Sequence, residues 1–236
     1  EESSLVMYRN HAADLALTAQ QVDKEYVQSA GMIVISGTAL AASPSREAAL
    51  KAALLARKAG TVVVFDIDYR GYTWKDAEEI SVYYTLMGRM SDIIMGSREE
   101  YDIMDAVLAP GMEDRQTADR WLGENAKIVV IKHGRQGSDA YTGEGECYHV
   151  QPFPVKAVKG FGGGDGYASS FLCALLEGFP VNECLERGSA SAAMLVASHG
   201  CSSFMPDREQ LEAFIHKEKQ RYGEIVSRRE SGDRGC

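Results

Sequence analysis

The sequence has little of what membrane proteins and nucleic-acid-binding proteins contain. In its 236 residues no apolar run approaches the roughly 20 residues that a helix needs to cross a bilayer, and no signal peptide is visible. Basic residues are in deficit, with 25 Lys and Arg against 34 Asp and Glu and a net charge of −9. The sequence therefore predicts neither a membrane nor a nucleic acid as partner, although backbone amides and a metal ion can still carry the phosphates of a nucleotide.

Cysteine is sparse, and its spacing excludes the common cysteine frameworks. The five cysteines are odd in number, scattered and without a Cys-x-x-Cys pair: Cys147, Cys173, Cys184, Cys201 and Cys236. Such a set disfavours a zinc site and favours reduced thiols. We therefore expect a cytoplasmic protein with free cysteines.

Two familiar phosphate-binding motifs are missing as well. No Gly-x-Gly-x-x-Gly follows an early strand, and no Gly-x-x-x-x-Gly-Lys-Ser/Thr occurs. Any phosphate chemistry must therefore use another loop. The first residue is Glu rather than Met, and Glu1-Glu2-Ser3-Ser4 lead directly into an apolar run, so we expect that a further segment precedes this chain.

What is present is an alternation of short apolar runs with helical patterns. Strands are expected at 32–35, 61–65, 92–95 and 127–131, and helices at about 45–59, 75–89, 98–108 and 113–123. Continuous apolar strands separated by helices indicate a mostly parallel sheet with both faces covered. The predicted class is α/β, with a three-layer αβα arrangement.

The pattern changes after residue 137. Segments 138–142 and 147–153 flank a Gly-Glu-Gly turn and predict a hairpin, and two long helices and a last helix at about 207–222 follow. We assign residues 1–226 to one domain. The tail 227–236 is polar and charged, and we expect it to fray.

The most informative local feature is the run Gly162-Gly163-Gly164-Asp165 before an apolar helix. Glycines leave the first N–H groups of the helix uncovered, and these donors with the helix dipole form a site for an anion such as phosphate. Asp165 fits there if its carboxylate takes a proton from a hydroxyl that attacks the phosphate. The alternative is a glycine turn followed by a helix-capping Asp.

Polar clusters follow three of the predicted strands, where parallel sheets bind their ligands. In Asp66-Ile67-Asp68-Tyr69-Arg70, the guanidinium suits a phosphorylated or acidic ligand, and the alternative is a surface ion pair. In Ser97-Arg98-Glu99-Glu100, Glu100 suits a hydrated Mg²⁺, and the alternative is a helix capping box. The third cluster, 132–137, has two glycines that allow close approach of a nucleotide, and the alternative is a hairpin turn. For His133 considered by itself, a structural role is favoured over a catalytic one.

In this order the clusters resemble the motifs of the ribokinase-type (PfkB) family of carbohydrate kinases. They correspond to an Asp-x-Asn-x-Arg-like element, an Asn-x-x-Glu-like element, a Gly-x-x-Gly turn and the Gly-Ala-Gly-Asp that opens a helix. Asp68 and Ser97 stand where Asn is usual, and Gly163 stands where Ala is usual. We expect the last exchange to be tolerated, because neither residue blocks the anion hole.

The resemblance implies a ribokinase-like fold, ATP and Mg²⁺ as cofactors, and a role for each matching residue. Asp165 would be the catalytic base, and Gly162, Gly163 and Gly164 would form the anion hole. Lys132, His133, Gly134, Gly137 and Ser97 would contact the nucleotide, and Glu100 would hold the metal through water. Arg9, Arg70 and Asp66 would bind an acidic sugar as the small-molecule partner.

Within the family, the likeness is greatest to the kinases that phosphorylate 5-dehydro-2-deoxygluconate in myo-inositol catabolism. It rests on segments 35–40, 43–47, 65–70 and 197–202. The implied reaction is ATP-dependent phosphorylation of a sugar-acid hydroxyl to the 6-phosphate. Kinases of 2-keto-3-deoxygluconate or fructose, and a non-catalytic nucleotide-binding remnant, are the alternatives.

The family's N-terminal third supplies the first strands, a lid and contacts to sugar hydroxyls, and nothing in this sequence matches it. We therefore expect these residues to be the nucleotide-binding and catalytic-base portion of a longer kinase, inactive alone. Strand edges left unpaired favour self-association into a homo-oligomer.

Overall fold

The computed structural model describes residues 12–229, which fall into two compact units. Of the described residues, the N-terminal unit contains 12–132 and 141–145, and the C-terminal unit contains 133–140 and 146–229. Among residues 12–229, no helix combines the length and the apolar character that a membrane span requires.

Four parallel strands form the sheet of the N-terminal unit: β1 (Met32–Ser36), β2 (Val62–Asp66), β3 (Ile93–Ser97) and β4 (Ile128–Lys132). They pair in sequence order, with Ile35 opposite Phe65 and Met95 opposite Val130. The central side chains of β2, β3 and β4 are buried, as the continuous apolar runs predict. In β1 only Ile35 is buried, and Val34 at the centre of the strand is 52% exposed. Each strand lies within two residues of its predicted range.

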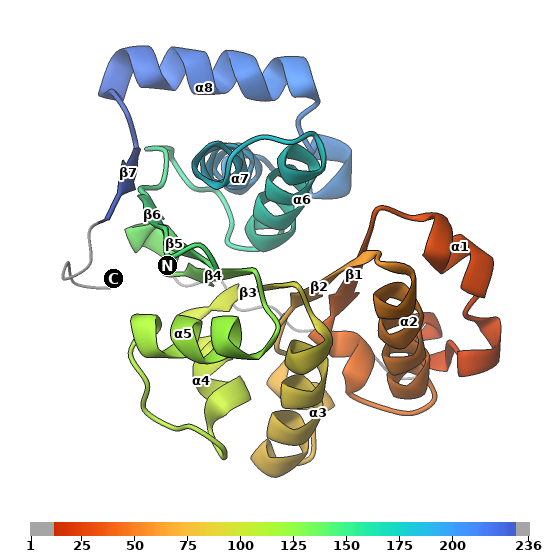
Figure 1. Ribbon diagram of the computed structural model, residues 1–236. Coiled ribbons are helices and arrows are strands. Elements are labelled where there is room, and N and C mark those ends of the chain that lie inside the picture. The colour runs from red at the N-terminus through yellow and green to blue at the C-terminus, as the bar shows by residue number, and fades with distance from the viewer. Residues whose placement is uncertain (1–11, 230–236) are drawn as a thin grey trace. The chain divides into compact units, whose positions relative to one another are not determined.

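Helices cover this sheet: α1 (Lys24–Ser29), α2 (Ser45–Ala59), α3 (Ala77–Met90), α4 (Arg98–Asp105) and α5 (Asp114–Glu124). Short 3₁₀ turns are η1 (Ala13–Ala16), η2 (Ala19–Gln21), η3 (Gly37–Leu40) and η4 (Gly71–Thr73). Figure 1 shows α2 to α5 together on one side of β1–β4. The buried face of α2 is built from alanines, and Gly60 ends the helix at φ 80°, as predicted.

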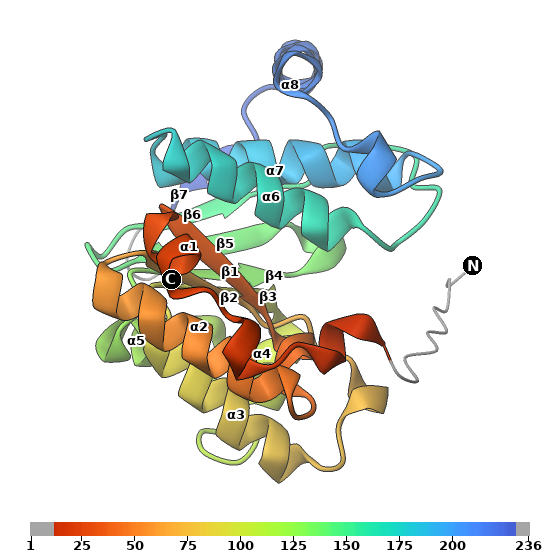
Figure 2. The ribbon, with the colours of Figure 1, turned by 90° about the vertical axis from the view of Figure 1, so that its right-hand side faces the viewer.

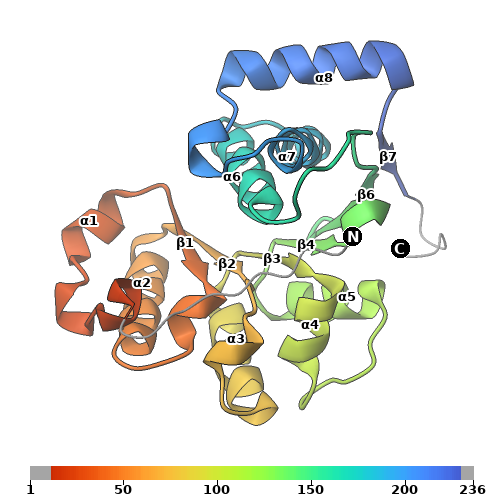
Figure 3. The ribbon, with the colours of Figure 1, turned by 180° about the vertical axis from the view of Figure 1, so that it is seen from behind.

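In its described residues, the C-terminal unit combines three short strands, the last two of which pair antiparallel, with three long helices. Its strands are β5 (Ser138–Thr142, of which the first three residues lie in this unit), β6 (Cys147–Val150) and β7 (Val226–Arg228). Its helices are α6 (Gly163–Leu176), α7 (Val181–Val196) and α8 (Arg208–Tyr222), with 3₁₀ turns η5 (Gly134–Gln136) and η6 (Ser202–Phe204). Figure 2 shows α6 and α7 side by side, and in Figure 3 α7 lies between α8 and β6.

The expectation that the chain frays from Ser227 is wrong for its first residues. Ser227 and Arg228 pair with His149 and Tyr148 in the β6–β7 ladder. Backbone bonds continue the ladder, because Arg229 N–H donates to the Cys147 carbonyl at 2.9 Å. A free strand edge thus captures a polar segment that carries no strand signal of its own.

The expectation of reduced cysteines is wrong at one position. Cys147 is disulfide-bonded, whereas Cys173, Cys184 and Cys201 are free thiols. Spacing alone gave no indication of this, because disulfide formation depends on which chain segments meet in space.

Candidate active site

The four strands of the N-terminal unit all end on a polar residue. Ser36 is paired with Asp66 across β1 and β2, and Ser97 is paired with Lys132 across β3 and β4. Lys132 Nζ lies 3.8 Å from Asp66 Oδ1, and both side chains are largely buried. The structure therefore brings the predicted Asp66, Ser97 and Lys132 to one edge of the sheet. Ser36 belongs to the same edge, and its position at the end of an apolar run was the signal that could have identified it.

Arg70 is held next to this edge by Asp68. Asp68 has φ 36°, an uncommon left-handed conformation for a residue other than glycine. Its carboxylate accepts a hydrogen bond from Ser36 Oγ at 2.7 Å and lies 2.5 Å from Arg70 Nη2. The alternative expectation, an ion pair at the strand end, is confirmed. The Arg70 side chain is still 36% exposed, so it is oriented and accessible at once.

Ser97 and Glu100 form the capping box that the sequence offered as the alternative. Ser97 Oγ accepts a hydrogen bond from Glu100 N–H at 3.2 Å, and Glu100 Oε2 accepts one from Ser97 N–H at 2.7 Å. Glu100 Oε1 also accepts one from Tyr69 N–H at 3.0 Å. Each carboxylate oxygen keeps a further lone pair, which suits contact with a metal-bound water better than direct ligation.

Residues 133–137 form a tight turn, which the sequence offered as the alternative to a nucleotide-binding loop. His133 N–H donates to the Gly137 carbonyl at 2.8 Å, and Gly134 and Gly137 have φ of 55° and 93°. A Cβ on Gly137 would lie 2.0 Å from the Val150 carbonyl oxygen, so only glycine fits there. The turn geometry therefore accounts for both glycines without a ligand.

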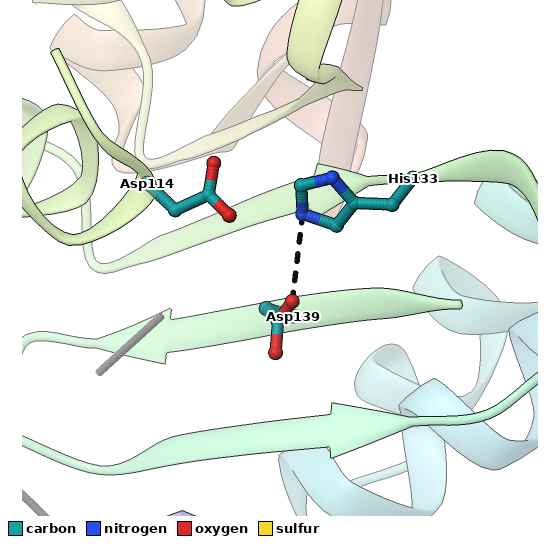
Figure 4. A group of neighbouring side chains, drawn as sticks. All are labelled: Asp114, His133 and Asp139. Atoms are coloured by element: carbon teal, nitrogen blue, oxygen red, sulfur yellow. Dashed lines mark ion pairs between the residues drawn. The ribbon is translucent and has the colours of Figure 1, made fainter. Parts of the chain in front are cut away.

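The His133 side chain is engaged with Asp139 (Figure 4). The distance from His133 Nε2 to Asp139 Oδ2 is 3.5 Å, and His149 Nδ1 lies 3.0 Å from the other Asp139 oxygen. Burial opposes ionisation of Asp139, but His133, His149 and Arg229 outweigh it and lower the pKa of this carboxyl. These contacts support the structural role that the sequence favours for His133.

The glycine run opens α6 as predicted. Gly162 is the N-cap residue at φ 82°, and α6 begins at Gly163. Gly166 N–H is bonded to the Gly162 carbonyl at 3.0 Å, which leaves the N–H groups before it without an intrahelical acceptor. Asp165 is the third residue of the helix and is exposed. No side chain caps this helix, so the alternative that Asp165 is the helix cap is wrong.

The glycine at position 163 has a packing reason. A Cβ on Gly163 would lie 2.8 Å from Val196 Cγ1 of α7, closer than real side chains approach. The expectation that glycine is tolerated at this position agrees with this contact, because the crowding would arise only with a Cβ. Among the predicted site residues, Arg9 lies outside the described part of the chain.

Residues 1–208 match the pfkB family carbohydrate kinase domain. The chain belongs to the pfkB family of carbohydrate kinases. Its relatives include the 5-dehydro-2-deoxygluconokinase of Clostridium perfringens, 59% identical over 227 residues, which are 96% of this chain and 67% of the relative. The enzyme of the same name from Geobacillus kaustophilus is 47% identical over 92% of this chain and 65% of the relative. This pfkB-family chain thus spans about two thirds of the length of the relatives it matches.

Solved structures support the fold. A ribokinase II of E. coli in complex with ATP and Mg²⁺ superimposes with a TM-score of 0.76 at 25% identity, over 86% of this chain and 64% of that one. A PfkB protein from Polaromonas gives a TM-score of 0.73 at 27% identity, over 86% and 63%. The predicted ribokinase-like α/β fold is confirmed.

Proposed function

We propose that this pfkB-family chain takes part in ATP-dependent phosphorylation of a sugar acid, 5-dehydro-2-deoxygluconate, to its 6-phosphate. The observation that carries the proposal is 59% identity, over 96% of the chain, to a relative named for that reaction. Kinases of 2-keto-3-deoxygluconate or fructose are less well supported, because the closely similar relatives share the one name. A non-catalytic remnant is disfavoured by the intact run of glycines before Asp165.

The proposed reaction assigns a separate task to each part of the glycine loop. The sugar hydroxyl loses its proton to the Asp165 carboxylate, and the hydroxyl oxygen bonds to the γ-phosphorus while the bond to the leaving ADP oxygen breaks. N–H groups of Gly163 and Gly164 stabilise the charge on the transferring phosphoryl oxygens. The exposure of Asp165 at the start of α6 supports this assignment.

Two further groups of residues suit the other ligands: the strand ends of the N-terminal unit and the turn at 133–137 of the C-terminal unit. We infer that Lys132, Ser97, His133, Gly134 and Gly137 contact the nucleotide, and that Arg70, Arg9 and Asp66 bind the sugar acid. A guanidinium held in place by Asp68 supports recognition of a carboxylate, because charge-assisted bonds are strong and directional.

The same edge fits a hydrated divalent cation, which we infer to be Mg²⁺. Glu100 offers lone pairs to a metal-bound water. A bound Mg²⁺ would neutralise phosphate charge. We also propose a cytoplasmic location and a homo-oligomeric state. Light scattering of the purified protein measures the oligomeric state.

A substrate panel tests the proposal. The natural full-length protein is assayed for ADP release with ATP, Mg²⁺ and each of the three sugars, and NMR locates the new phosphate ester. We expect kcat/KM for 5-dehydro-2-deoxygluconate to exceed the other two by at least tenfold. A preference for fructose, or no ADP release with any sugar, contradicts it. The 236-residue chain assayed alongside tests whether these residues suffice.

A further inference from the structure

Segment 197–202 is one of the segments on which the family resemblance rests, but the proposed reaction assigns no role to it. In the C-terminal unit, two side chains converge on one carbonyl of this segment. The Gly200 carbonyl accepts hydrogen bonds from Ser198 Oγ, at 3.0 Å, and from Lys159 Nζ. A Cβ on Gly200 would lie 2.2 Å from the Phe204 ring, so the backbone here is closely confined. The carbonyl is thus a fixed anchor for the lysine.

Lys159 lies directly beside the glycine loop. A Cβ on Gly162 would be 3.5 Å from Lys159 Nζ and 3.0 Å from Cys201 Sγ. The ammonium also donates to Cys201 Sγ at 3.3 Å and lies 4.5 Å from the centre of the Phe161 ring. Three contacts, to the Gly200 carbonyl, Cys201 Sγ and the Phe161 ring, therefore define the position of this ammonium next to the N-cap residue of α6.

The backbone on both sides of the lysine is tied to the end of α7. Val158 N–H and Lys159 N–H both donate to the Val196 carbonyl, at 2.7 and 3.2 Å. Val196 is the same residue that contacts the space next to Gly163. The segment that leads into the glycine loop is thus held at its backbone by α7 and, through the Lys159 side chain, by Gly200.

The charge of Lys159 is not cancelled by its partners. Its contacts are a carbonyl oxygen, a sulfur and an aromatic ring, and within residues 12–229 no carboxylate forms an ion pair with it. A positive charge in a fixed place beside N–H donors strengthens the binding of an anion and costs no reorganisation when charge develops.

We propose that Lys159 is the positioning residue of the phosphate loop. Its ammonium, anchored on Gly200 and Cys201, fixes the Gly162–Gly164 turn and adds a positive charge beside the transferring phosphoryl group. This inference rests on the proposed kinase function and assigns a purpose to the 197–202 segment. A structural bridge alone would stabilise the fold without affecting the phosphoryl transfer step.

The test compares Lys159→Met, which keeps the length of the stem, with Lys156→Met as control. Lys156 is an exposed lysine three positions earlier on the same segment. We expect Lys159→Met to lower kcat about 10²-fold, the loss seen for one preorganised donor, with KM for the sugar little changed. Lys156→Met should leave kcat unchanged. Circular dichroism and the melting temperature show whether each variant is folded.

Chemical rescue separates charge from structure. In Lys159→Ala the vacated space can admit a small cation, and we expect ammonium or methylammonium to restore kcat at least tenfold with saturation. Tetramethylammonium at equal ionic strength is too large and should restore nothing. A folded Lys159→Met with normal kcat overturns the inference, and so does a loss that no small cation restores. If Lys159→Ala does not fold, Lys159→Arg takes its place, and kcat as low as in Lys159→Met overturns the inference. An inactive wild type would instead refute the proposed function.

Discussion

Asp165 is the third residue of α6, and its carboxylate is exposed beside the free N–H groups of the glycine loop. Replacement by asparagine keeps the shape and removes the base. We expect Asp165→Asn to lower kcat about 10²–10⁴-fold, because that is the usual contribution of a general base. Nucleotide affinity should stay the same or rise slightly, since a negative charge near the phosphates is removed. Stopped assays for kcat and calorimetry for nucleotide binding measure the two effects.

The control for Asp165→Asn is Asp119→Asn, a carboxylate exposed on α5 and paired with Arg115. It should leave kcat and nucleotide affinity unchanged. Near-normal kcat in a folded Asp165→Asn protein would remove Asp165 from the proposed mechanism.

Arg70 tests whether the substrate is an acid. Its guanidinium is oriented by Asp68 and by a bond to the Tyr69 carbonyl at 2.8 Å. A hydrogen bond to a charged group contributes about 1.5–3 kcal/mol, so Arg70→Met should raise KM for the sugar acid about 10–100-fold. Arg9→Ala should act in the same direction. For a neutral analogue with an alcohol in place of the carboxylate, both effects should be small. Equal increases for the acid and its neutral analogue argue against recognition of the carboxylate.

Because α6 and α7 pack closely at Gly163, we expect a larger residue at this position to destabilise the fold. Alanine at position 163 would force Val196 to move, because the two atoms would be 2.8 Å apart. We expect Gly163→Ala to lower the free energy of unfolding by about 1–3 kcal/mol, as overpacking does. Adding Val196→Ala should recover part of that loss. Urea unfolding of the single and double variants gives the coupling energy.

Gly123→Ala is the matched control for Gly163→Ala. Gly123 lies inside α5, and no atom comes within 4 Å of the place where its Cβ would be. Here alanine should stabilise the protein by about 0.5–1 kcal/mol, because it restricts the unfolded chain without a clash. Additive effects of Gly163→Ala and Val196→Ala would show that the close contact has no energetic consequence.

At the scale of the whole molecule, we expect the free energy of unfolding to depend on pH because of Asp105. This carboxyl at the end of α4 is 2% exposed and forms an ion pair with Arg120. Burial raises its pKa to about 6, although Arg120 acts in the opposite direction. An unfolded Asp releases its proton near pH 4, so between about pH 4 and 6 the folded state binds more protons. The contribution of Asp105 to stability therefore falls as pH rises through that window.

Urea unfolding of wild type and Asp105→Asn from pH 4 to pH 7 checks this sign. The free energy of unfolding of wild type, relative to the variant, should fall by up to about 3 kcal/mol as pH rises from about 4 to 6. Above that range the difference should be constant. Asp119→Asn, whose carboxylate is exposed, should run parallel to wild type. Parallel curves for Asp105→Asn as well would show that the buried carboxyl does not couple to folding.

The sequence by itself determined most of the elements and the strand ends at which the polar clusters lie. Apolar runs of strand length identified β1 to β4, Gly60 marked the end of α2, and the glycine run marked the start of α6. These signals are local, because they depend on periodicity and on the backbone freedom of single residues. Polar residues at the strand ends followed from the parallel topology, which is why Asp66, Ser97 and Lys132 could be predicted to lie together.

The tertiary structure decided which partner each side chain has. Arg46, in the 43–47 segment, is buried and donates to the Leu40 and Ala41 carbonyls and to Glu79. Ser36 reaches Asp68, and Lys159 reaches Gly200, across 32 and 41 residues of sequence. Neither pair has a periodic signal, because such contacts are created by packing between elements rather than by propensity within one. For the same reason strand β7 and the close approach of Val196 to Gly163 could not be predicted from the sequence.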